Sequence, residues 1–596
     1  MEYKRKLNIP DISVQQSVEG FEARKKILLE LTAEKEITAQ ELLDPSLDLY
    51  SNRAAANLVL GRFSKEANQR IRRTAEWFDH PHPHKRRHDG ECDFAAMKLC
   101  RTFHLFSGTD QFEEKTRGAI RRFFLTFDFR SRHGSENHAL LFRTSRYLMA
   151  QALPESEFKA YSEKGEKLLK TDRAWLKHYI RFRARRGWGE FDSLCYFLPE
   201  WECLLNLCDY SRDQELRDLA GMMLDLLLAD MAVDSLNGMY GGAHGRIYAS
   251  HALDHASANT YPLQYLYFGS VDQESLMTPY RAAKKTLVDA LVSSYRPAEI
   301  IPAIALKRTA PYENRERKHL HNTEDIMPED PLRGSIRKYT FWTPGYVLGC
   351  VQKQDPYPRS CPGKWYAHHE QHQWELTIGT RTTSRIFTHH PGKQGDEHGY
   401  WTGDLRCGCG HFFQHRNALI ALYDIPGNEP YTFIHAYLPR DSFEEIHEKD
   451  GWIFVREGGV YAGLKLLNGY TWTLKGEWKD REVISRGNRN GVVCEAGPAS
   501  EFASFGDFQK SLPGNTIEFS RKNMSLTYTS ARSGKLEIDT HGTRKLDSTD
   551  ADLDYPAYGC PYINSEWDSG IIGLTHDKKR LTLDFISGTR SYETGR

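Results

Sequence analysis

The sequence predicts an α+β multidomain chain, in which an N-terminal (α/α) toroid of helical hairpins is followed by a large antiparallel β-sandwich. Two observations lead to this prediction. From about residue 12 to 296, apolar residues recur every three or four positions, which is typical of amphipathic helices. Beyond Ile336 the period falls to two and aromatic and β-branched residues become frequent, which is typical of strands. We therefore expect a toroid over residues 1–300, a linker over 301–335 and a sandwich over 336–596.

The expected helices follow one another with short breaks containing Gly, Pro, Asp or Ser, as in antiparallel helical hairpins. About ten helices before residue 300 are too many for one four-helix bundle, and no sharp 34-residue repeat is present. A toroid fits this count better. The segments with helical periodicity are 51–77, 92–106, 111–127, 137–151, 155–182, 193–210 and 213–231.

The expected strands are separated by turns rich in Gly, Asn and Asp, such as Arg489-Asn490-Gly491. Such turns between alternating segments indicate an antiparallel sandwich. The segments with strand periodicity are 339–348, 374–382, 418–423, 452–457, 460–466, 470–474 and 581–586.

Composition excludes several classes of protein. Eighty basic and 80 acidic residues among 596 argue against a protein whose whole surface binds polyanions, although a local basic groove remains compatible with them, and we expect no nucleic-acid partner. Eleven scattered cysteines form neither a disulfide framework nor a zinc-ribbon spacing. We expect no membrane span and recognise no secretion signal in the chain as given. Phosphate-loop, dinucleotide-binding and GxSxG motifs are absent from the sequence.

Asn137 and His138 stand at the start of an expected helix that also carries Arg143. One interpretation is an ordinary helix N-terminus, where polar residues cap the backbone and acidic ones suit the dipole. The other is an amide and an imidazole directed into a cleft.

A basic and aromatic segment extends from Arg181 to Tyr196 and contains Arg183, Arg186, Trp188 and Glu190. Guanidinium groups pair with carboxylates and an indole stacks on sugar rings, so this segment could line a groove for an anionic glycan. The alternative is the solvated basic end of a helix.

A glycine-rich loop at 237–248 interrupts the helical pattern and carries His244, Arg246 and Tyr248. Glycines let a backbone approach a ligand closely, and these three polar residues have little local structural purpose. We interpret the loop as part of a functional site.

Histidines are dense early in the expected sandwich, at His368, His369 and His372 and again at His389 and His390. The first three precede an expected strand and do not form an HExxH motif. Two interpretations stay open: these residues are ordinary surface histidines, or they form a functional cluster.

Together, these features resemble the polysaccharide lyases of the heparinase II/III-like and alginate-lyase type, over nearly the whole chain. Asn137-His138 matches the Asn-His of that family's toroid, and 187–190 with Tyr196 looks like its Tyr-bearing helix start. Residues 368–376 take the place of the family's His-Gly-His-x-Asp stretch. The glycine is missing, and Gln373 stands where an Asp that helps to hold a metal is expected, so calcium, zinc or no metal all stay open.

The resemblance implies β-elimination in an acidic polysaccharide or oligosaccharide, with a periplasmic or secreted location. Asn137 and His138 would stabilise the charge that develops when the C5 proton of a uronate leaves. Tyr196 would protonate the departing O4 and, in a syn elimination, also act as the base, whereas an anti path would use His244 or His372. The substrate-binding residues that the resemblance and the motifs imply are Arg143, Arg183, Arg186, Trp188, Glu190, Arg246, Tyr248 and His369.

Two other functions remain compatible with the sequence. A glycoside hydrolase on the same toroid would need paired carboxylates, for which Glu190, Asp192, Glu200 and Asp254 are available. A non-catalytic glycan-binding protein would need only aromatic and basic surfaces.

Overall fold

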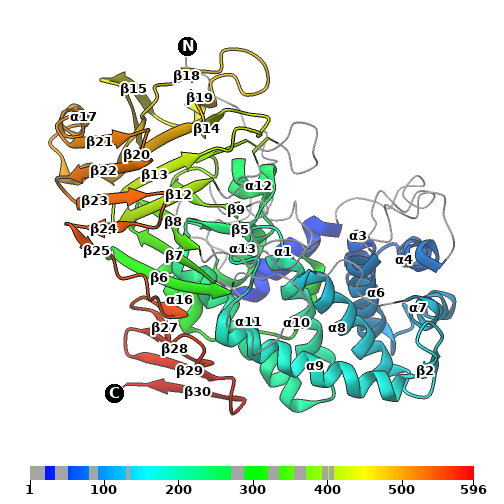
Figure 1. Cartoon of the computed structure of the whole chain (residues 1–596). Coiled ribbons are helices and arrows are strands. Elements are labelled where there is room, and N and C mark those ends of the chain that lie inside the picture. Colours follow the sequence, from blue (N-terminus) through cyan, green and yellow to red (C-terminus); the bar gives the residue numbers. More distant parts are fainter. Residues whose placement is uncertain are drawn as a thin grey trace.

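The computed structural model describes residues 20–33, 51–79, 92–128, 135–269, 287–319, 335–354, 371–391, 400–401 and 409–595. Helices occupy the N-terminal part and antiparallel sheets the C-terminal part (Figure 1). The predicted α+β class and the order of its two parts are therefore confirmed.

The described helices pack mainly as sequential hairpins, with α8 against α9 and α10 against α11. Their bounds are α1 Phe21–Ala33, α3 Asn52–Val59, α4 Ser64–Asp79, α6 Cys92–Phe106, α7 Glu114–Thr126, α8 Glu136–Ala152, α9 Gly165–Arg186, α10 Phe197–Tyr210, α11 Gln214–Asp234, α12 Ala249–Leu253, α13 Thr260–Phe268, α15 Val288–Val292, α16 Ile300–Leu306 and α17 Phe505–Ser511.

Two helix predictions were wrong in their extent. The single helix expected over 51–77 is two helices, because the chain reverses between them through Gly61 and Phe63, both with positive φ. The helix expected from residue 155 begins at Gly165, after a hairpin of β1 Glu157–Phe158 and β2 Glu163–Lys164. Leu216 shows a helix start of the expected kind: its amide donates to the side chain of Asp213 at 2.9 Å.

Three sheets make up most of the C-terminal part. Thirteen strands form the largest, in the order β18-β19-β14-β11-β10-β8-β7-β6-β26-β27-β28-β29-β30, six form β12-β13-β20-β17-β16-β15 and five form β21 to β25. Their bounds are β6 Tyr312–His319, β7 Ser335–Trp342, β8 Tyr346–Gln354, β10 Trp374–Ile378, β11 Arg385–His389, β12 Gly410–His415, β13 Ala418–Asp424, β14 Phe433–Tyr437, β15 Glu445–Lys449, β16 Trp452–Glu457, β17 Val460–Leu466, β18 Thr471–Trp472, β19 Glu482–Arg486, β20 Arg489–Pro498, β21 Thr516–Ser520, β22 Ser525–Ser530, β23 Gly534–Asp539, β24 Arg544–Leu546, β25 Thr549–Asp550, β26 Tyr558–Gly559, β27 Ile563–Ser565, β28 Ile571–His576, β29 Lys579–Asp584 and β30 Thr589–Thr594.

The six-stranded sheet is the middle layer of the three. Along β13, Leu419 and Ala421 join the core shared with the largest sheet, whereas Ile420 and Leu422 join the core shared with the five-stranded sheet. Because successive side chains of a strand point to opposite faces, a strand buried on both faces is apolar throughout. The sequence of β13 has this pattern.

The sheet begins earlier than predicted. The described part of the expected linker contains α16 and β6, and β6 pairs with β7 along its whole length. The strand expected over 339–348 is likewise two strands, β7 and β8, which are joined by a turn. Charged and polar residues occupy almost every position of β6 (Tyr-Glu-Asn-Arg-Glu-Arg-Lys-His), so the sequence pattern indicated a linker rather than a strand.

Two of the described regions that join the helical and sheet parts are a pair of short strands and a shared core. Short strands β5 His244–Arg246 and β9 Gln371–His372 pair antiparallel, with His244 opposite His372. Strands β27 to β29 contribute to the helical core, with β28 against α16 (Figure 1). The candidate site lies beside the first of these junctions.

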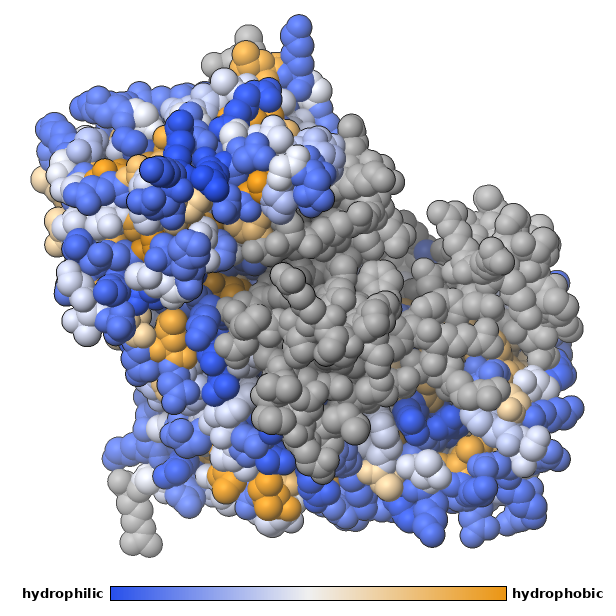
Figure 2. All heavy atoms as spheres, in the orientation of Figure 1, coloured by the Kyte–Doolittle hydropathy of each residue, from blue (hydrophilic) through white to orange (hydrophobic). Residues whose placement is uncertain are grey.

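The described surface in Figure 2 is mainly hydrophilic, and apolar atoms form small separate patches on it. Among the helices that the structure describes, none has the length and apolar composition needed to cross a membrane.

Candidate active site

Two loops meet at the junction of helices and sheets, one after α9 and one after α11. Gly187, with φ +69°, ends α9. Gly245 donates its N–H to the Phe191 carbonyl at 2.6 Å, and a Cβ at Gly245 would lie 2.6 Å from the Phe191 nitrogen. Only glycine permits this contact, which explains one glycine of the 237–248 loop.

A chain of hydrogen-bonded polar side chains connects the two loops at this contact. Asn137 Nδ2 donates to Glu190 Oε2 at 2.7 Å, and Arg246 Nη1 donates to the other Glu190 oxygen at 3.2 Å. Arg246 Nη2 donates to the Tyr248 hydroxyl at 3.2 Å, and the Tyr248 and Tyr196 hydroxyls are hydrogen-bonded to each other. The guanidinium carbon of Arg246 also lies 4.1 Å from the centre of the Tyr196 ring. We call these five residues the tyrosine–arginine group.

The tyrosine–arginine group has a buried end and an accessible end. Asn137 and Glu190 are 0% and 3% exposed, Tyr196 is 8% exposed, and Arg246 and Tyr248 are half-buried. Burial raises the pKa of Tyr196 well above 10, against the opposing effect of the Arg246 charge. Tyr196 is therefore a neutral phenol near pH 7, the form that can donate a proton.

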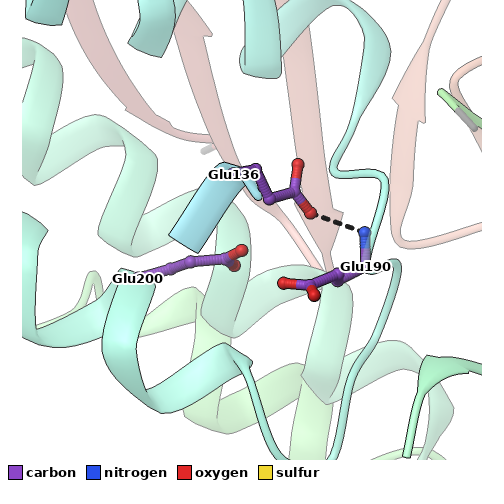
Figure 3. A group of neighbouring side chains, drawn as sticks. All are labelled: Glu136, Glu190 and Glu200. Atoms are coloured by element: carbon purple, nitrogen blue, oxygen red, sulfur yellow. Dashed lines mark hydrogen bonds between the residues drawn. The ribbon is translucent and has the colours of Figure 1, made fainter. Parts of the chain in front are cut away.

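Two more carboxylates, those of Glu136 and Glu200, lie beside Glu190 at the buried end (Figure 3). Glu136 accepts hydrogen bonds from the Gly189 and Glu190 amides, at 3.1 and 2.5 Å, and pairs with Arg183 at 2.6 Å. Glu200 points toward Glu136 and Glu190, and its Oε1 has no hydrogen-bond partner among the described residues.

Burial dominates the protonation of this carboxylate group. It raises the pKa of Glu136 to about 7, with the Arg183 charge opposing it and Glu190 adding to it. Burial, followed by the charges of Glu136 and Glu190, raises the pKa of Glu200 well above its usual value. A cavity of about 10 Å³, space for about one water molecule, borders Glu190 and Glu200.

The predicted alternative bases, His244 and His372, are fully buried. His244 Nδ1 lies 2.8 Å from the Asp192 carbonyl oxygen and must donate to it, so its Nε2 carries the lone pair. His372 Nε2 contacts Glu375 at 2.7 Å and its Nδ1 contacts His389 at 3.0 Å. Burial lowers the pKa of both His244 and His372, so both rings are neutral near pH 7.

Glu375 is a site residue that the sequence did not indicate. It binds His255 at 3.0 Å and also pairs with His372 and Arg385. The Arg385 charge, together with hydrogen bonds from His255 and His372, overcomes burial and holds the pKa of Glu375 well below its usual value. The sequence feature that could have indicated Glu375 is its charge within the otherwise largely apolar strand β10. Its partners come from distant segments and could not be predicted from that feature.

Several predicted substrate-binding residues have other contacts. Arg143 binds Asp172 at 3.2 Å and lies over Trp175, and Arg186 binds Asp568 at 2.8 Å next to the sheet. His138, which is predicted to be catalytic, is hydrogen-bonded to Asp93. These side chains hold helices and sheets together.

Two more predicted binding residues, Arg183 and Trp188, are buried, with 0% and 5% of their surface exposed. The Arg183 guanidinium carbon lies 5.4 Å from the centre of the Trp188 ring. His369 lies outside the described residues.

A buried ionic cluster supports the loop that carries Glu190. Lys338 Nζ binds Asp192, Asp234 at 2.5 Å and Glu316 at 3.1 Å, and Lys318 lies 3.5 Å from Asp192. Asp192 has a φ of +51°, an uncommon backbone conformation outside glycine. Two strands of the sandwich thus hold a loop of the helical part in place.

Two groups of three described carboxylates are close enough to share a metal: Glu136, Glu190 and Glu200, and Asp192, Asp234 and Glu316. The ammonium of Lys338 already serves as the cation of the second group. Arg183 provides positive charge beside the first. Calcium, zinc and no metal therefore all stay open.

No family model and no curated protein matches the chain. Among solved structures, it is similar to the chondroitin AC lyase of Streptomyces coelicolor A3, determined in complex with chondroitin sulphate. The identity is 8% and the TM-score 0.43, over 95% of this chain and 89% of that one. A likeness of this size carries no inference about activity, which we argue from the site alone.

Proposed function

We propose that this chain is a polysaccharide lyase that cleaves a 4-linked uronate glycan by β-elimination. The observation that supports this proposal most directly is the tyrosine–arginine group. Its accessible end presents the half-buried Tyr248 phenol beside a guanidinium, with the buried Tyr196 phenol hydrogen-bonded to Tyr248, and its buried end holds that guanidinium through Glu190. Acid–base chemistry next to a carboxylate-binding cation is what this elimination requires.

In this proposal Arg246 binds the uronate carboxylate and stabilises the negative charge that develops as the C5–H bond breaks. The electron pair of that bond forms the C4–C5 double bond, and the C4–O4 bond breaks. Tyr196, a neutral phenol, donates its proton to the departing O4. Tyr248, bonded to both Tyr196 and Arg246, takes the C5 proton and gives its own phenolic proton to Tyr196, so both phenols are neutral again after the elimination.

This arrangement assigns proton transfer to phenols rather than histidines. His244 and His372 are fully buried, whereas Tyr248 is half-buried. Asn137 is also fully buried and binds Glu190, so in this proposal it positions Arg246 through Glu190.

The arrangement of carboxylates does not favour a glycoside hydrolase. Such an enzyme needs two accessible carboxyl groups about 5–9.5 Å apart, on either side of the bond. Glu190 and Glu200 are each 3% exposed, and Asp192 is paired with two lysines. Asp254 accepts a hydrogen bond from the Ala256 amide at the start of a short helical turn.

The experiment is to follow absorbance near 230 nm while the chain is offered alginate, hyaluronan, chondroitin sulphate and polygalacturonate. A rise with one of them supports elimination and identifies the substrate. New reducing ends without absorbance would support the hydrolase instead. Neither signal with any of the polymers would count against the proposal.

A further inference from the structure

A groove in the sandwich, separate from the candidate active site, has the features of a second binding site. Its volume is about 690 Å³, within the range of about 300–1,000 Å³ typical of ligand pockets. It lies between the middle and outer sheets, where β16, β17 and β21 come together. In Figure 1, β21 lies at the upper left, whereas the helices α8 to α10 lie below and to the right of the sheets. We call it the sandwich groove.

The pattern of β21 explains one wall. Ile517 and Phe519 are two residues apart and share one face of this edge strand, and Asn515 and Arg521, which flank the strand, line the groove with them. The wall therefore presents two half-buried apolar side chains between an amide and an exposed guanidinium.

The other wall comes from two paired residues. Trp452 and Lys465 are opposite each other in the register of β16 and β17, and Lys465 Nζ lies 5.4 Å from the centre of the Trp452 ring. Trp452 is fully buried, and its Nε1 has no hydrogen-bond partner among the described residues. A buried indole N–H usually has a partner, so this one indicates a ligand or a water molecule.

The charges in the groove have one sign. Lys465 and Arg521 are basic, and of the described residues that line the groove none is acidic. Lys465 donates one hydrogen bond, at 3.0 Å, to the carbonyl oxygen of Asp450, and an ammonium has three N–H groups to donate. Burial lowers the pKa of Lys465, because its charge is partly removed from water. An anion in the groove would restore that lost solvation.

We propose that the sandwich groove binds an anionic saccharide unit, with its carboxylate between Lys465 and Arg521 and its ring against Ile517 and Phe519. A pyranose ring has the apolar faces and polar edges that such walls match. The proposal extends the proposed function, because it gives the chain a second hold on the same acidic polymer. Such a hold would raise the affinity for long chains and leave short substrates unaffected.

The test compares two double variants with equal loss of charge. Lys465→Gln/Arg521→Gln alters the groove, and Lys449→Gln/Lys522→Gln removes two exposed lysines nearby that do not line it. Each migrates through gels containing alginate, hyaluronan, chondroitin sulphate or neutral dextran. We expect the groove variant to bind an acidic polymer about tenfold more weakly than the control, a difference of about 1.4 kcal/mol. The proposal would be overturned if the two variants migrated equally in every gel with an acidic polymer. It would also be overturned if neutral dextran retarded the chain as strongly as the acidic polymers do.

Two further measurements separate the groove from the proposed lyase activity. Turnover of a short uronate oligosaccharide should be the same in both double variants, and a selective loss in the groove variant would contradict a separate site. If the groove variant loses polymer binding although the wild type makes no unsaturated product, the groove stands and the lyase proposal falls. Arg521→Gln alone, at an exposed position, replaces the double variant if the latter does not fold.

Discussion

Replacing Lys338 with methionine should strongly destabilise the junction between the helical and sheet parts. The side chain is fully buried, and its ammonium contacts Asp192, Asp234 and Glu316, which are also buried. Methionine fills a similar volume, but of the described ion pairs of these three carboxylates only those of Lys318 with Asp192 and Glu316 then remain, and Asp234 loses the ammonium that pairs with it. Removing one partner from a buried ionic group typically costs about 3–5 kcal/mol.

The assay is guanidinium-induced unfolding at pH 7, followed by tryptophan fluorescence, with Lys522→Met at an exposed position as the control. The control should change the unfolding free energy by less than about 0.5 kcal/mol. Adding Asp234→Asn to Lys338→Met should recover about 1–2 kcal/mol, because one uncompensated charge is removed. A loss below about 1 kcal/mol for Lys338→Met, or no recovery in the double variant, would refute the role of this cluster.

Three more predictions concern the site and the helical core. Tyr196→Phe should lower turnover by about 100-fold or more without changing the unfolding midpoint, because the phenol is the proton donor; a variant that keeps most of its activity refutes that role. Asn137→Ala should lower kcat about tenfold and alter KM less, since Asn137 acts through Glu190, and a raised KM with unchanged kcat contradicts this. Burial lowers the pKa of His104 to about 4, so its contribution to stability is present above pH 6.5 and is lost as the pH falls toward 4. Between pH 6.5 and 4 the unfolding free energy should therefore fall by up to about 3 kcal/mol more in the wild type than in His104→Gln. Curves of unfolding midpoint against pH that run parallel for the two proteins would contradict the burial effect.

The spacing of apolar residues predicted the helices and strands best where apolar residues recur with one period, either helical or strand-like. The helix expected over 92–106 is present as α6 with the same bounds, and the strands expected over 452–457 and 460–466 are β16 and β17. The strand β6 was missed because its polar residues are buried against the ionic cluster rather than facing water. No local period reveals a buried charge whose partners come from other segments.

The candidate site shows the same division. Asn137, Glu190, Tyr196, Arg246 and Tyr248 were all indicated by the sequence, and the structure brings them together. Helix ends and glycine-rich loops identify polar residues that have no local partner, and these five lie at such places.

Arg183 and Trp188 were indicated by the same kind of signal, yet they are buried. Whether an arginine at a helix end faces a cleft or the core depends on the segment packed over it. Here Gly187, one turn beyond Arg183, lies against Lys318 of β6, the strand that the sequence did not reveal.

The most direct measurement is the mass of the products formed from an acidic polysaccharide in water enriched in heavy oxygen. β-Elimination breaks the C4–O4 bond without adding water, so one product should be lighter than the hydrolysis product by one water and neither should carry the label. Incorporation of heavy oxygen at the new reducing end during cleavage, with no unsaturated product, would show hydrolysis and contradict the proposed chemistry of Tyr196 and Arg246.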